Sequence, residues 1–197
     1  MKDNIILTGF MGCGKTSVGI RLSYVLRRTL IDTDKWIEKK QGKTVSEIFA
    51  KDGEEAFRRM ESECIRELIG TADGQIISTG GGLPVRKENR KLLKELGTVY
   101  YLKVTPECVY ERLKGDTARP LLQGENPREK IRELLEAREA LYTEGADVTI
   151  EVSGKSFEEI IAGITEKMEE HENTDYQRTE PELSWNPGEK YLRNPGL

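Results

Sequence analysis

The chain has 197 residues, enough for one well-buried domain and too few for two. Its formal net charge of −4 gives no overall attraction to polyanions, which argues against partners such as nucleic acid or a membrane surface. Three widely spaced cysteines and a single histidine supply neither a metal site nor a Ser-His-Asp triad. With no signal peptide or membrane-length apolar run, we expect a cytoplasmic monomer.

The first motif along the chain is Gly9–Thr16, which has the pattern G-x-x-x-x-G-K-[ST]. A short apolar run, Ile5–Leu7, precedes it and a helical pattern follows, which is the context that makes the motif specific. Glycines let backbone N–H groups surround a phosphate chain, Lys15 can meet the outer phosphates, and the Thr16 hydroxyl can bind Mg²⁺. A glycine-rich turn with a chance Lys-Thr pair is the plain alternative. The motif predicts a nucleoside triphosphate site.

Two aspartates follow the second strand of the chain. A helix is expected over residues 15–28, then a strand over Thr29–Ile31 that ends in Asp32-Thr33-Asp34. Carboxylates at the carboxyl end of a parallel strand lie where open sheets bind ligands. The alternative is a solvated turn in which Asp34 caps a helix beginning near Lys35.

The middle of the chain carries an arginine and three glycines. A capping box predicts a short helix over Thr44–Phe49, and an apolar stripe predicts a longer one over Glu54–Ile69 that carries Arg58. The third strand, Gln75–Thr79, leads into Gly80-Gly81-Gly82, where the backbone can approach a ligand closely. A solvated arginine and a flexible connector are the corresponding alternatives.

Another strand and a break in periodicity follow. We expect a helix over Lys87–Leu96, a strand over Thr98–Val104 and a helix from Pro106 that carries Arg112. Residues 115–125, with Arg119, have no periodic pattern. They are read either as a mobile flap or as an ordinary exposed loop.

The last elements complete an alternating pattern. A helix is expected over Asn126–Tyr142, a strand over Asp147–Val152 at a sheet edge, and a final helix over Ser156–Met168. We expect one domain over residues 1–170 and a poorly packed polar tail over 171–197. The alternation predicts an α/β fold with three layers, in which helices cover both faces of a five-stranded parallel sheet.

Several uses of a bound nucleotide can be separated from the sequence. No Asn-Lys-x-Asp guanine-binding motif is present, and the third strand ends in Ser78-Thr79 instead of an aspartate of the Walker B type. Phosphoryl transfer by a small kinase needs phosphate clamps, a metal, an acceptor site and a lid. Lys15, the loop amides and Arg119 can serve as clamps, residues 115–125 as the lid, and Thr16 with Asp32 as the Mg²⁺ site, in which Asp32 acts through water.

These motifs together resemble the shikimate kinase family, over Met1 to about Met168. The resemblance is carried by Gly9–Thr16, Asp32–Asp34, Phe57-Arg58 with Glu61, Gly80–Gly82, Arg119–Leu122, and Arg138 with Leu141-Tyr142. It implies a P-loop kinase of the nucleoside-monophosphate-kinase type with strand order 2-3-1-4-5. It also implies transfer of the ATP γ-phosphate to the 3-hydroxyl of shikimate, in aromatic amino-acid biosynthesis.

The resemblance also implies a role for each site residue. Arg58 and Arg138 correspond to the pair that binds the shikimate carboxylate, as guanidinium groups do bidentately. Asp34 corresponds to the residue that binds the acceptor hydroxyls, for which positioning fits better than proton abstraction. The catalytic residues are then Lys15, Asp34 and Arg119. Acceptor binding falls to Asp34, Arg58, Gly80, Gly81, Gly82 and Arg138, and ATP binding to Gly12, Cys13, Gly14, Lys15, Thr16, Ser17, Arg112 and Arg119.

Two other functions stay open at this point. A kinase for another small molecule, such as gluconate or a nucleotide, has the same fold, although Arg58 and Arg138 suit a hydroxylated carboxylate better than a base. A nucleotide-binding regulatory module without turnover is the alternative outside the enzymes. Intact Asp34, Arg58, Arg119 and Arg138 argue against it, because a sensor does not need an acceptor site.

Overall fold

Five parallel strands form the centre of the structure, in the order β2-β3-β1-β4-β5. The structure is a computed structural model, which describes residues 3–114 and 126–179 and the side chains up to residue 170. The strands are β1 (Ile5–Thr8), β2 (Leu30–Asp32), β3 (Ile76–Ser78), β4 (Thr98–Lys103) and β5 (Val148–Glu151). The predicted order 2-3-1-4-5 is confirmed, and β5 lies at an edge as expected.

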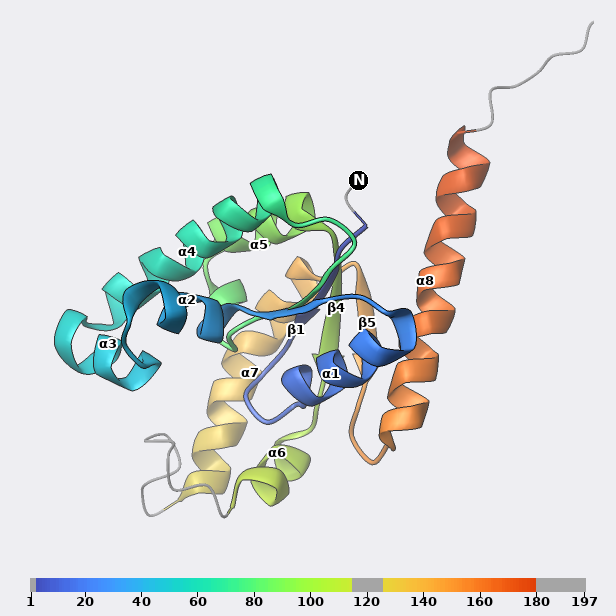
Figure 1. Ribbon diagram of the computed structural model, residues 1–197. Helices are drawn as coiled ribbons and strands as arrows, with labels where there is room; N and C mark the ends of the chain where they lie inside the picture. Colours follow the sequence, from blue (N-terminus) through green and yellow to red (C-terminus); the bar gives the residue numbers. More distant parts are fainter. Residues whose placement is uncertain (1–2, 115–125, 180–197) are drawn as a thin grey trace, which may run out of the picture.

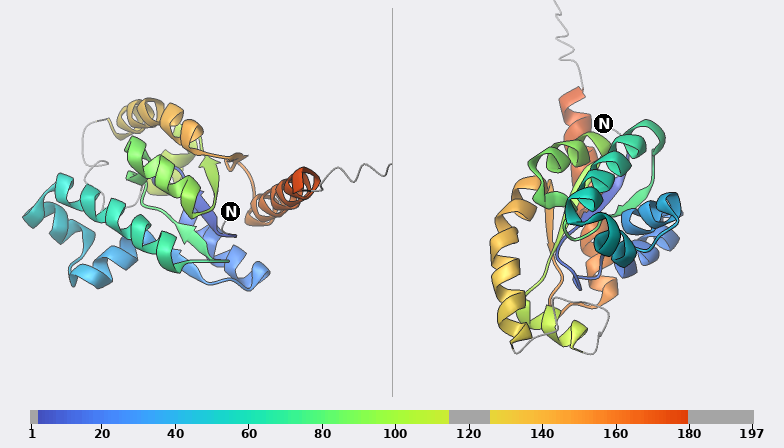
Figure 2. Two further views of the ribbon diagram at one scale, coloured as in Figure 1. Left: turned by 90° about the horizontal axis from the view of Figure 1, so that it is seen from above. Right: turned by 90° about the vertical axis from the view of Figure 1, so that its left-hand side faces the viewer.

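Helices cover both faces of the sheet (Figures 1 and 2). In chain order the helices are α1 (Lys15–Leu26), α2 (Thr33–Gln41), α3 (Val45–Asp52), α4 (Glu54–Thr71), the 3-10 turn η1 (Leu83–Val85), α5 (Lys87–Leu96), α6 (Pro106–Leu113), α7 (Pro127–Gly145) and α8 (Phe157–Thr179). Helices α1 and α8 lie on one face, and α4, α5 and α7 lie on the other (Figure 2). The three predicted layers are confirmed.

Alternation along β1 explains why both faces are buried. Ile5 and Leu7 belong to the core cluster that includes α1 and α8, whereas Ile6 belongs to the cluster that includes α4 and α5. All three side chains are at most 2% exposed. A strand buried on both faces reads as a continuous apolar run, which is what the sequence has before the phosphate loop.

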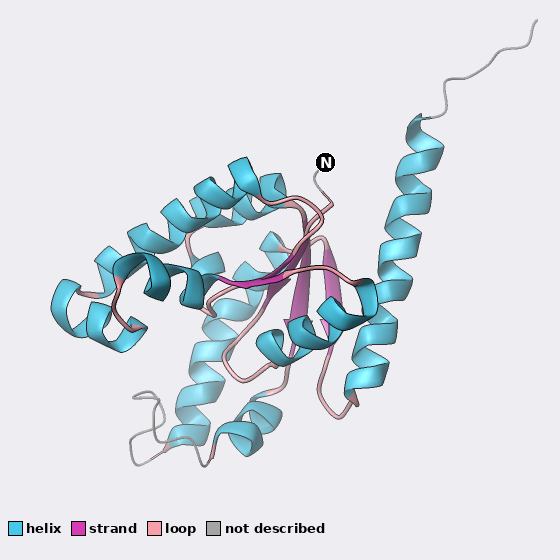
Figure 3. Ribbon diagram, in the orientation of Figure 1, coloured by secondary structure: helices cyan, strands magenta, loops and turns pink. Residues whose placement is uncertain are grey.

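Helices α2 and α3 lie beside α4 at one end of the molecule, away from α8 (Figure 3). Asp32 caps α2: its Oδ1 accepts hydrogen bonds from the backbone N–H groups of Asp34 and Lys35. The alternative in which Asp34 caps this helix is therefore wrong, because β2 extends to Asp32 and the helix begins at once with Thr33. The Asp34 side chain is left available for another use.

The final helix, α8, is longer than predicted and projects beyond the sheet (Figure 1). The sequence predicts an end near Met168, but the helix runs to Thr179, so the predicted start of the tail at residue 171 falls inside a helix. Residues 180–197 and the expected lid over residues 115–125 lie outside the described residues. No helix among the described residues has both the length and the apolar character needed to cross a bilayer.

Candidate functional site

The phosphate loop joins β1 to α1 at the carboxyl edge of the sheet. Gly9, Gly12 and Gly14 have φ values of 141°, 73° and 102°, which side chains with a Cβ rarely adopt. The Lys15 Nζ donates to the carbonyl oxygens of Gly9 and Phe10, at 2.8 and 3.0 Å. The loop thus folds around the lysine ammonium group next to the positive end of α1, an arrangement suited to a polyphosphate.

Three oxygen-bearing side chains meet beside the loop. The Thr16 hydroxyl donates to Asp32 Oδ2 at 3.0 Å and lies 3.4 Å from the Ser78 hydroxyl. Hard cations such as Mg²⁺ prefer oxygen ligands of this kind and keep several waters. Over the described residues no group of three His, Cys, Asp or Glu side chains is placed to hold a metal. The oxygen set of Thr16 and Asp32 fits Mg²⁺ held beside phosphate and water, rather than an all-protein cage.

Arg58 on α4 is held by two carboxylates of its own helix. Its Nη1 donates to Glu61 Oε2 at 2.8 Å, while Nη2 and Nε donate to Glu54 Oε1 at 2.8 and 3.2 Å. Glu61 is fully buried and the Glu54 side chain is 66% exposed. The guanidinium group is therefore fixed from one side by a buried partner and from the other by a solvated one.

The three glycines after β3 leave space for charged side chains to pack against the backbone. A Cβ on Gly82 would lie 2.2 Å from Arg58 Nη1, and a Cβ on Gly80 would lie 2.5 Å from Asp34 Oδ1 and 3.0 Å from Glu61 Oε1. A Cβ on Gly81 would lie 3.4 Å from the backbone nitrogen of Met11 in the phosphate loop. Glycines 80 and 82 thus let charged side chains pack on the backbone, and Gly81 brings that backbone to the phosphate loop.

Burial raises the pKa values of the two carboxyl groups next to Gly80, those of Asp34 and Glu61. Asp34 Oδ1 and Glu61 Oε1 are buried and have no hydrogen-bond partner among the described residues. Desolvation raises the pKa of Asp34, the Asp32 carboxylate raises it further, and Lys15 acts in the opposite direction. Desolvation likewise raises the pKa of Glu61 to about 7, against the effect of Arg58. Asp34 also lines the cleft beside the phosphate loop, so its unpaired oxygen is suited to bind a hydroxylated ligand.

Arg138 reaches this region from α7. It interacts with the phenol of Tyr142, one turn later on the same helix, whose hydroxyl donates to the Gly81 carbonyl oxygen at 2.6 Å. Burial raises the pKa of Tyr142 to about 12, and the charges of Arg138 and Arg58 both act in the opposite direction. Both guanidinium groups therefore act on one phenol beside the glycines, although they belong to different helices.

One cleft joins the phosphate loop to Asp34 and Gly81, and Arg58 and Arg138 are not among its lining residues. It has a volume of about 740 Å³ and is lined at one end by Asp34, Thr79 and Gly81, and in its middle by the phosphate loop through Ser17 and by Asp32. The far end is lined by Arg112 and by residues 155–157 and 160. Arg112 Nη1 donates to the carbonyl oxygens of Gly12 and Cys13, both at 3.1 Å.

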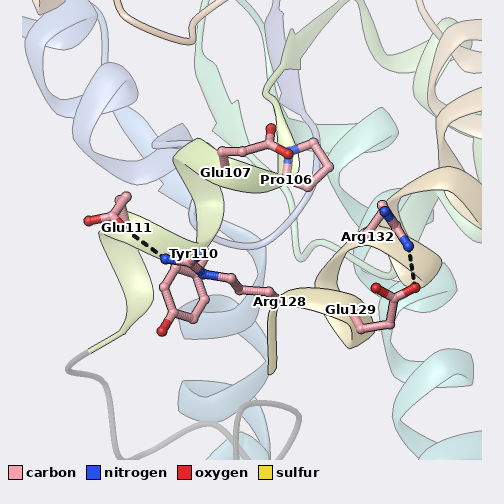
Figure 4. A pocket seen from close by; sticks show the side chains of 7 residues that line it. All are labelled: Pro106, Glu107, Tyr110, Glu111, Arg128, Glu129 and Arg132. Carbon is pink, nitrogen blue, oxygen red and sulfur yellow. Dashed lines mark hydrogen bonds and ion pairs between the residues drawn. The ribbon is translucent and has the colours of Figure 1, made fainter. Parts of the chain in front are cut away.

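Arg119, which is predicted to act from the lid, lies outside the described residues. A second pocket of about 280 Å³ lies between α6 and α7 (Figure 4). Arg132 pairs there with Glu129, and Arg128 lies 3.8 Å from Glu111 and over the Tyr110 ring. None of the residues predicted for the site lines this pocket.

The sequence does not predict a functional role for several residues at the site, among them Glu61, Tyr142 and Phe157. In the sequence, Glu61 and Tyr142 belong to motifs of the family, and Phe157 belongs to the start of a helix. A signal for Glu61 exists in the sequence, because it occupies a position of the apolar stripe of α4 three residues after Arg58. Tyr142 and Phe157 reach the site through tertiary contacts, for which the local pattern gives no signal.

Comparison with known proteins decides between the kinases that this fold can carry. The family model described as shikimate kinase matches residues 11–169. The chain belongs to the shikimate kinase family. The shikimate kinases of Symbiobacterium thermophilum and Thermodesulfovibrio yellowstonii are 43% and 46% identical to it, over 85% and 86% of this chain and 97% of each relative.

Solved structures agree with this family. The shikimate kinase of Acinetobacter baumannii in complex with shikimate matches with a TM-score of 0.80 at 39% identity, over 87% of this chain and 95% of that one. A gluconokinase from Sinorhizobium meliloti has a TM-score of 0.55 at 14% identity, over 90% of this chain and 98% of that one, which shows a shared fold only. As a shikimate kinase family member, the chain is an enzyme, an ATP-dependent phosphotransferase.

Proposed function

We propose that the chain transfers the γ-phosphate of ATP to the 3-hydroxyl of shikimate, giving ADP and shikimate 3-phosphate for aromatic amino-acid biosynthesis. The observation that carries this proposal is the single cleft that runs from the phosphate loop to Asp34 and Gly81. A small acid bound at the Asp34 end lies next to the outer phosphate of a nucleotide bound at Lys15. Membership of the shikimate kinase family supplies the identity of that acid.

Acceptor binding is assigned to side chains around the glycine segment that follows β3. Arg58 and Arg138 bind the shikimate carboxylate, because guanidinium groups bind carboxylates bidentately and keep their charge. Asp34 accepts hydrogen bonds from the ring hydroxyls and orients the attacking one. The backbone of Gly80, Gly81 and Gly82 lines the pocket and approaches the ring without side chains in between.

Nucleotide binding is assigned to the loop and the far end of the cleft. Amides of Gly12, Cys13, Gly14, Thr16 and Ser17 surround the phosphates with Lys15, and Arg112 contacts the base. Arg119 closes over the transferring phosphate from the lid at residues 115–125. Thr16, and Asp32 through water, would hold one Mg²⁺ ion, which would neutralise phosphate charge.

The chemical step then requires mainly positioning. The 3-oxygen of shikimate attacks the γ-phosphorus, the bond from that phosphorus to the bridging oxygen of ADP breaks, and the hydroxyl proton leaves late. Asp34 orients the hydroxyl and can accept its proton after transfer. Lys15 and Arg119 stabilise the negative charge on the transferring group, in a cleft from which the closed lid excludes water.

The first experiment measures ADP release with ATP, Mg²⁺ and a panel of shikimate, gluconate and nucleoside monophosphates. ADP formation with shikimate alone is the expected result. Turnover with gluconate or a nucleotide instead would replace the proposed acceptor. Repeating the assay after chelation, with Mg²⁺ or Ca²⁺ added back, tests the identity of the ion.

A second experiment separates acceptor binding from ATP binding. Arg138→Ala is expected to raise the KM for shikimate roughly ten- to a hundredfold, which is the loss of affinity expected when a charge-assisted hydrogen-bond pair is removed. The KM for ATP should change little. Arg132→Ala, on the same helix and paired with Glu129, is the matched control and should change neither. Equal effects of Arg138→Ala on both KM values would remove Arg138 from the acceptor site.

A third experiment addresses the phosphate loop. Lys15→Ala should abolish turnover while the circular-dichroism spectrum and unfolding temperature stay near those of the wild type. Loss of the fold would mean that Lys15 acts structurally through its bonds to Gly9 and Phe10.

The localisation, oligomeric state and domain bounds of the enzyme are also proposed. We infer a cytoplasmic monomer that binds neither nucleic acid nor membranes, with residues 1–170 as the kinase domain and 171–197 as a tail outside the catalytic site. Light scattering across the working concentration range tests the monomer, and a dimer mass would replace it.

A further inference from the structure

The two carboxylates that hold Arg58 lie on opposite sides of it along α4. Glu54 precedes it by four residues and Glu61 follows it by three, so all three share one helix face. Glu61 Oε2 accepts a hydrogen bond from Nη1 at 2.8 Å. A single oxygen of Glu54, Oε1, accepts hydrogen bonds from both Nε and Nη2, at 3.2 and 2.8 Å. Each side of the guanidinium group therefore has its own carboxylate.

The Nη1 end is closed to any ligand. Glu61 is 0% exposed, and the Gly82 backbone lies so close that a Cβ there would come 2.2 Å from Nη1. Replacing Glu61 by a ligand would leave a buried carboxylate without its partner. The Arg58–Glu61 contact is therefore expected to stay in place through the reaction.

The Nε/Nη2 edge is different. The Arg58 side chain keeps 17% of its surface exposed, and the Glu54 side chain on this edge is 66% exposed. A solvated carboxylate can leave an ion pair at little cost, because water replaces the lost contacts. This edge also has the parallel N–H geometry that a carboxylate ligand binds bidentately.

We propose that Glu54 is an internal competitor of the acceptor: its carboxylate occupies the Nε/Nη2 edge of Arg58 that receives the carboxylate of the substrate, and it leaves when the substrate binds. The inference rests on the proposed role of Arg58. Glu54 keeps the guanidinium group in its binding orientation in the free enzyme. That contact must be broken before the acceptor can bind, so Glu54 lowers the affinity for the acceptor.

If Glu54 competes with the acceptor, removing its charge should increase the affinity for the acceptor. Removing one partner of a purely structural ion pair should not. Glu54→Gln is expected to lower the KM for shikimate about two- to fivefold, the range of an exposed ion pair, and to leave the KM for ATP unchanged. Glu55→Gln is the matched control, because it makes the same charge change in the same helical turn but pairs with Arg86. It should leave both KM values unchanged.

A double variant shows whether the effect passes through Arg58. In an Arg58→Ala background, Glu54→Gln should no longer change the KM for shikimate, since the edge over which the two carboxylates compete is gone. A KM for Glu54→Gln equal to or above the wild-type value overturns the inference. An equal decrease for Glu55→Gln overturns it too, because it indicates a general charge effect.

The same variants distinguish a failure of the competitor role of Glu54 from a failure of the proposed function. If Arg58→Ala raises the KM for shikimate and Glu54→Gln does not lower it, the competitor role alone fails. If Arg58→Ala leaves that KM unchanged, Arg58 does not bind the acceptor, and both the assignment of Arg58 and the inference fall.

Discussion

The hydroxyl of Tyr142 donates a hydrogen bond to the carbonyl oxygen of Gly81, at 2.6 Å. This bond ties α7 to the glycine segment that follows β3, 61 residues earlier in the chain. The Tyr142 ring is buried and stacks on Tyr101 with ring centres 5.2 Å apart. Since Arg138 lies one turn before Tyr142 on α7, the bond also fixes where Arg138 sits relative to the acceptor pocket.

Replacing Tyr142 with phenylalanine removes this bond and the interaction of the phenol with Arg138, and it keeps the ring. The Gly81 carbonyl loses its partner, so unfolding should require about 1–2 kcal/mol less. Because the bond also positions Arg138, the KM for shikimate should rise severalfold and the KM for ATP should not. Urea unfolding and steady-state kinetics measure the two effects.

Tyr101→Phe is the matched control for this variant. Its hydroxyl is buried and has no hydrogen-bond partner among the described residues, so removing it leaves no group unpaired. Stability should stay the same or rise. If Tyr101→Phe and Tyr142→Phe lose equal stability and activity, the bond to Gly81 is not what positions α7.

Gly82 offers a second test, because its backbone accepts an alanine and its surroundings do not. Its φ and ψ of −91° and −12° are ordinary for any residue, but a Cβ would lie 2.2 Å from Arg58 Nη1. Gly82→Ala is therefore expected to displace the guanidinium group and raise the KM for shikimate by about tenfold.

The control for Gly82→Ala is Gly70→Ala in the last turns of α4. A Cβ on Gly70 meets no atom within 4 Å, and alanine favours a helix over glycine by up to about 1 kcal/mol. Gly70→Ala should keep the KM and slightly raise the unfolding temperature. A Gly82→Ala variant with wild-type KM would mean that Arg58 does not need its present position.

The sheet order and the phosphate loop could be predicted because they depend on local patterns and on one family resemblance. Apolar runs, capping residues and glycines recur along the chain in the order that a parallel α/β fold requires. What could not be predicted is how side chains from distant elements meet. The packing of Arg58 on Gly82, for example, depends on the distance between α4 and the end of β3, which no local pattern gives.

Two further differences between the sequence prediction and the structure have local causes. Asp32-Thr33-Asp34 offers more than one residue able to cap a helix, and the exact end of β2 decides that Asp32 does so. Glu61 interrupts the apolar stripe of α4, which is a detectable signal of a buried charge. Its meaning requires the tertiary contact with Gly80, because a surface carboxylate at that spacing pairs equally well with Arg58.

The double use of Asp32 gives a third prediction. It caps α2 and accepts a hydrogen bond from Thr16 in the proposed Mg²⁺ site. Asparagine caps helices as well as aspartate does, so Asp32→Asn should keep the stability but raise the Mg²⁺ concentration needed for half-maximal activity about tenfold or more. Asp32→Ala should show the same metal effect and lose about 1 kcal/mol of stability as well. An unchanged Mg²⁺ dependence in Asp32→Asn would exclude Asp32 from the metal site.

The buried Glu61 should make stability depend on pH. Burial raises its folded pKa from 4.5 to about 7, so between these values the folded chain keeps a proton that the unfolded chain has lost. The stabilisation is fully present below pH 4.5 and is lost as the pH rises toward 7, by about 3 kcal/mol in total. Glu61→Gln removes this titration and keeps a carbonyl oxygen for Arg58.

The measurement is urea unfolding of wild type and Glu61→Gln in steps from pH 4.5 to pH 8. Subtracting the two curves cancels the groups that both proteins share, so the difference isolates Glu61. The wild type should lose stability relative to the variant as the pH rises to about 7, and the difference should then be constant. Parallel curves across this range would mean that Glu61 is ionised in the folded protein at acidic pH, and that its pairing with Arg58 outweighs its burial.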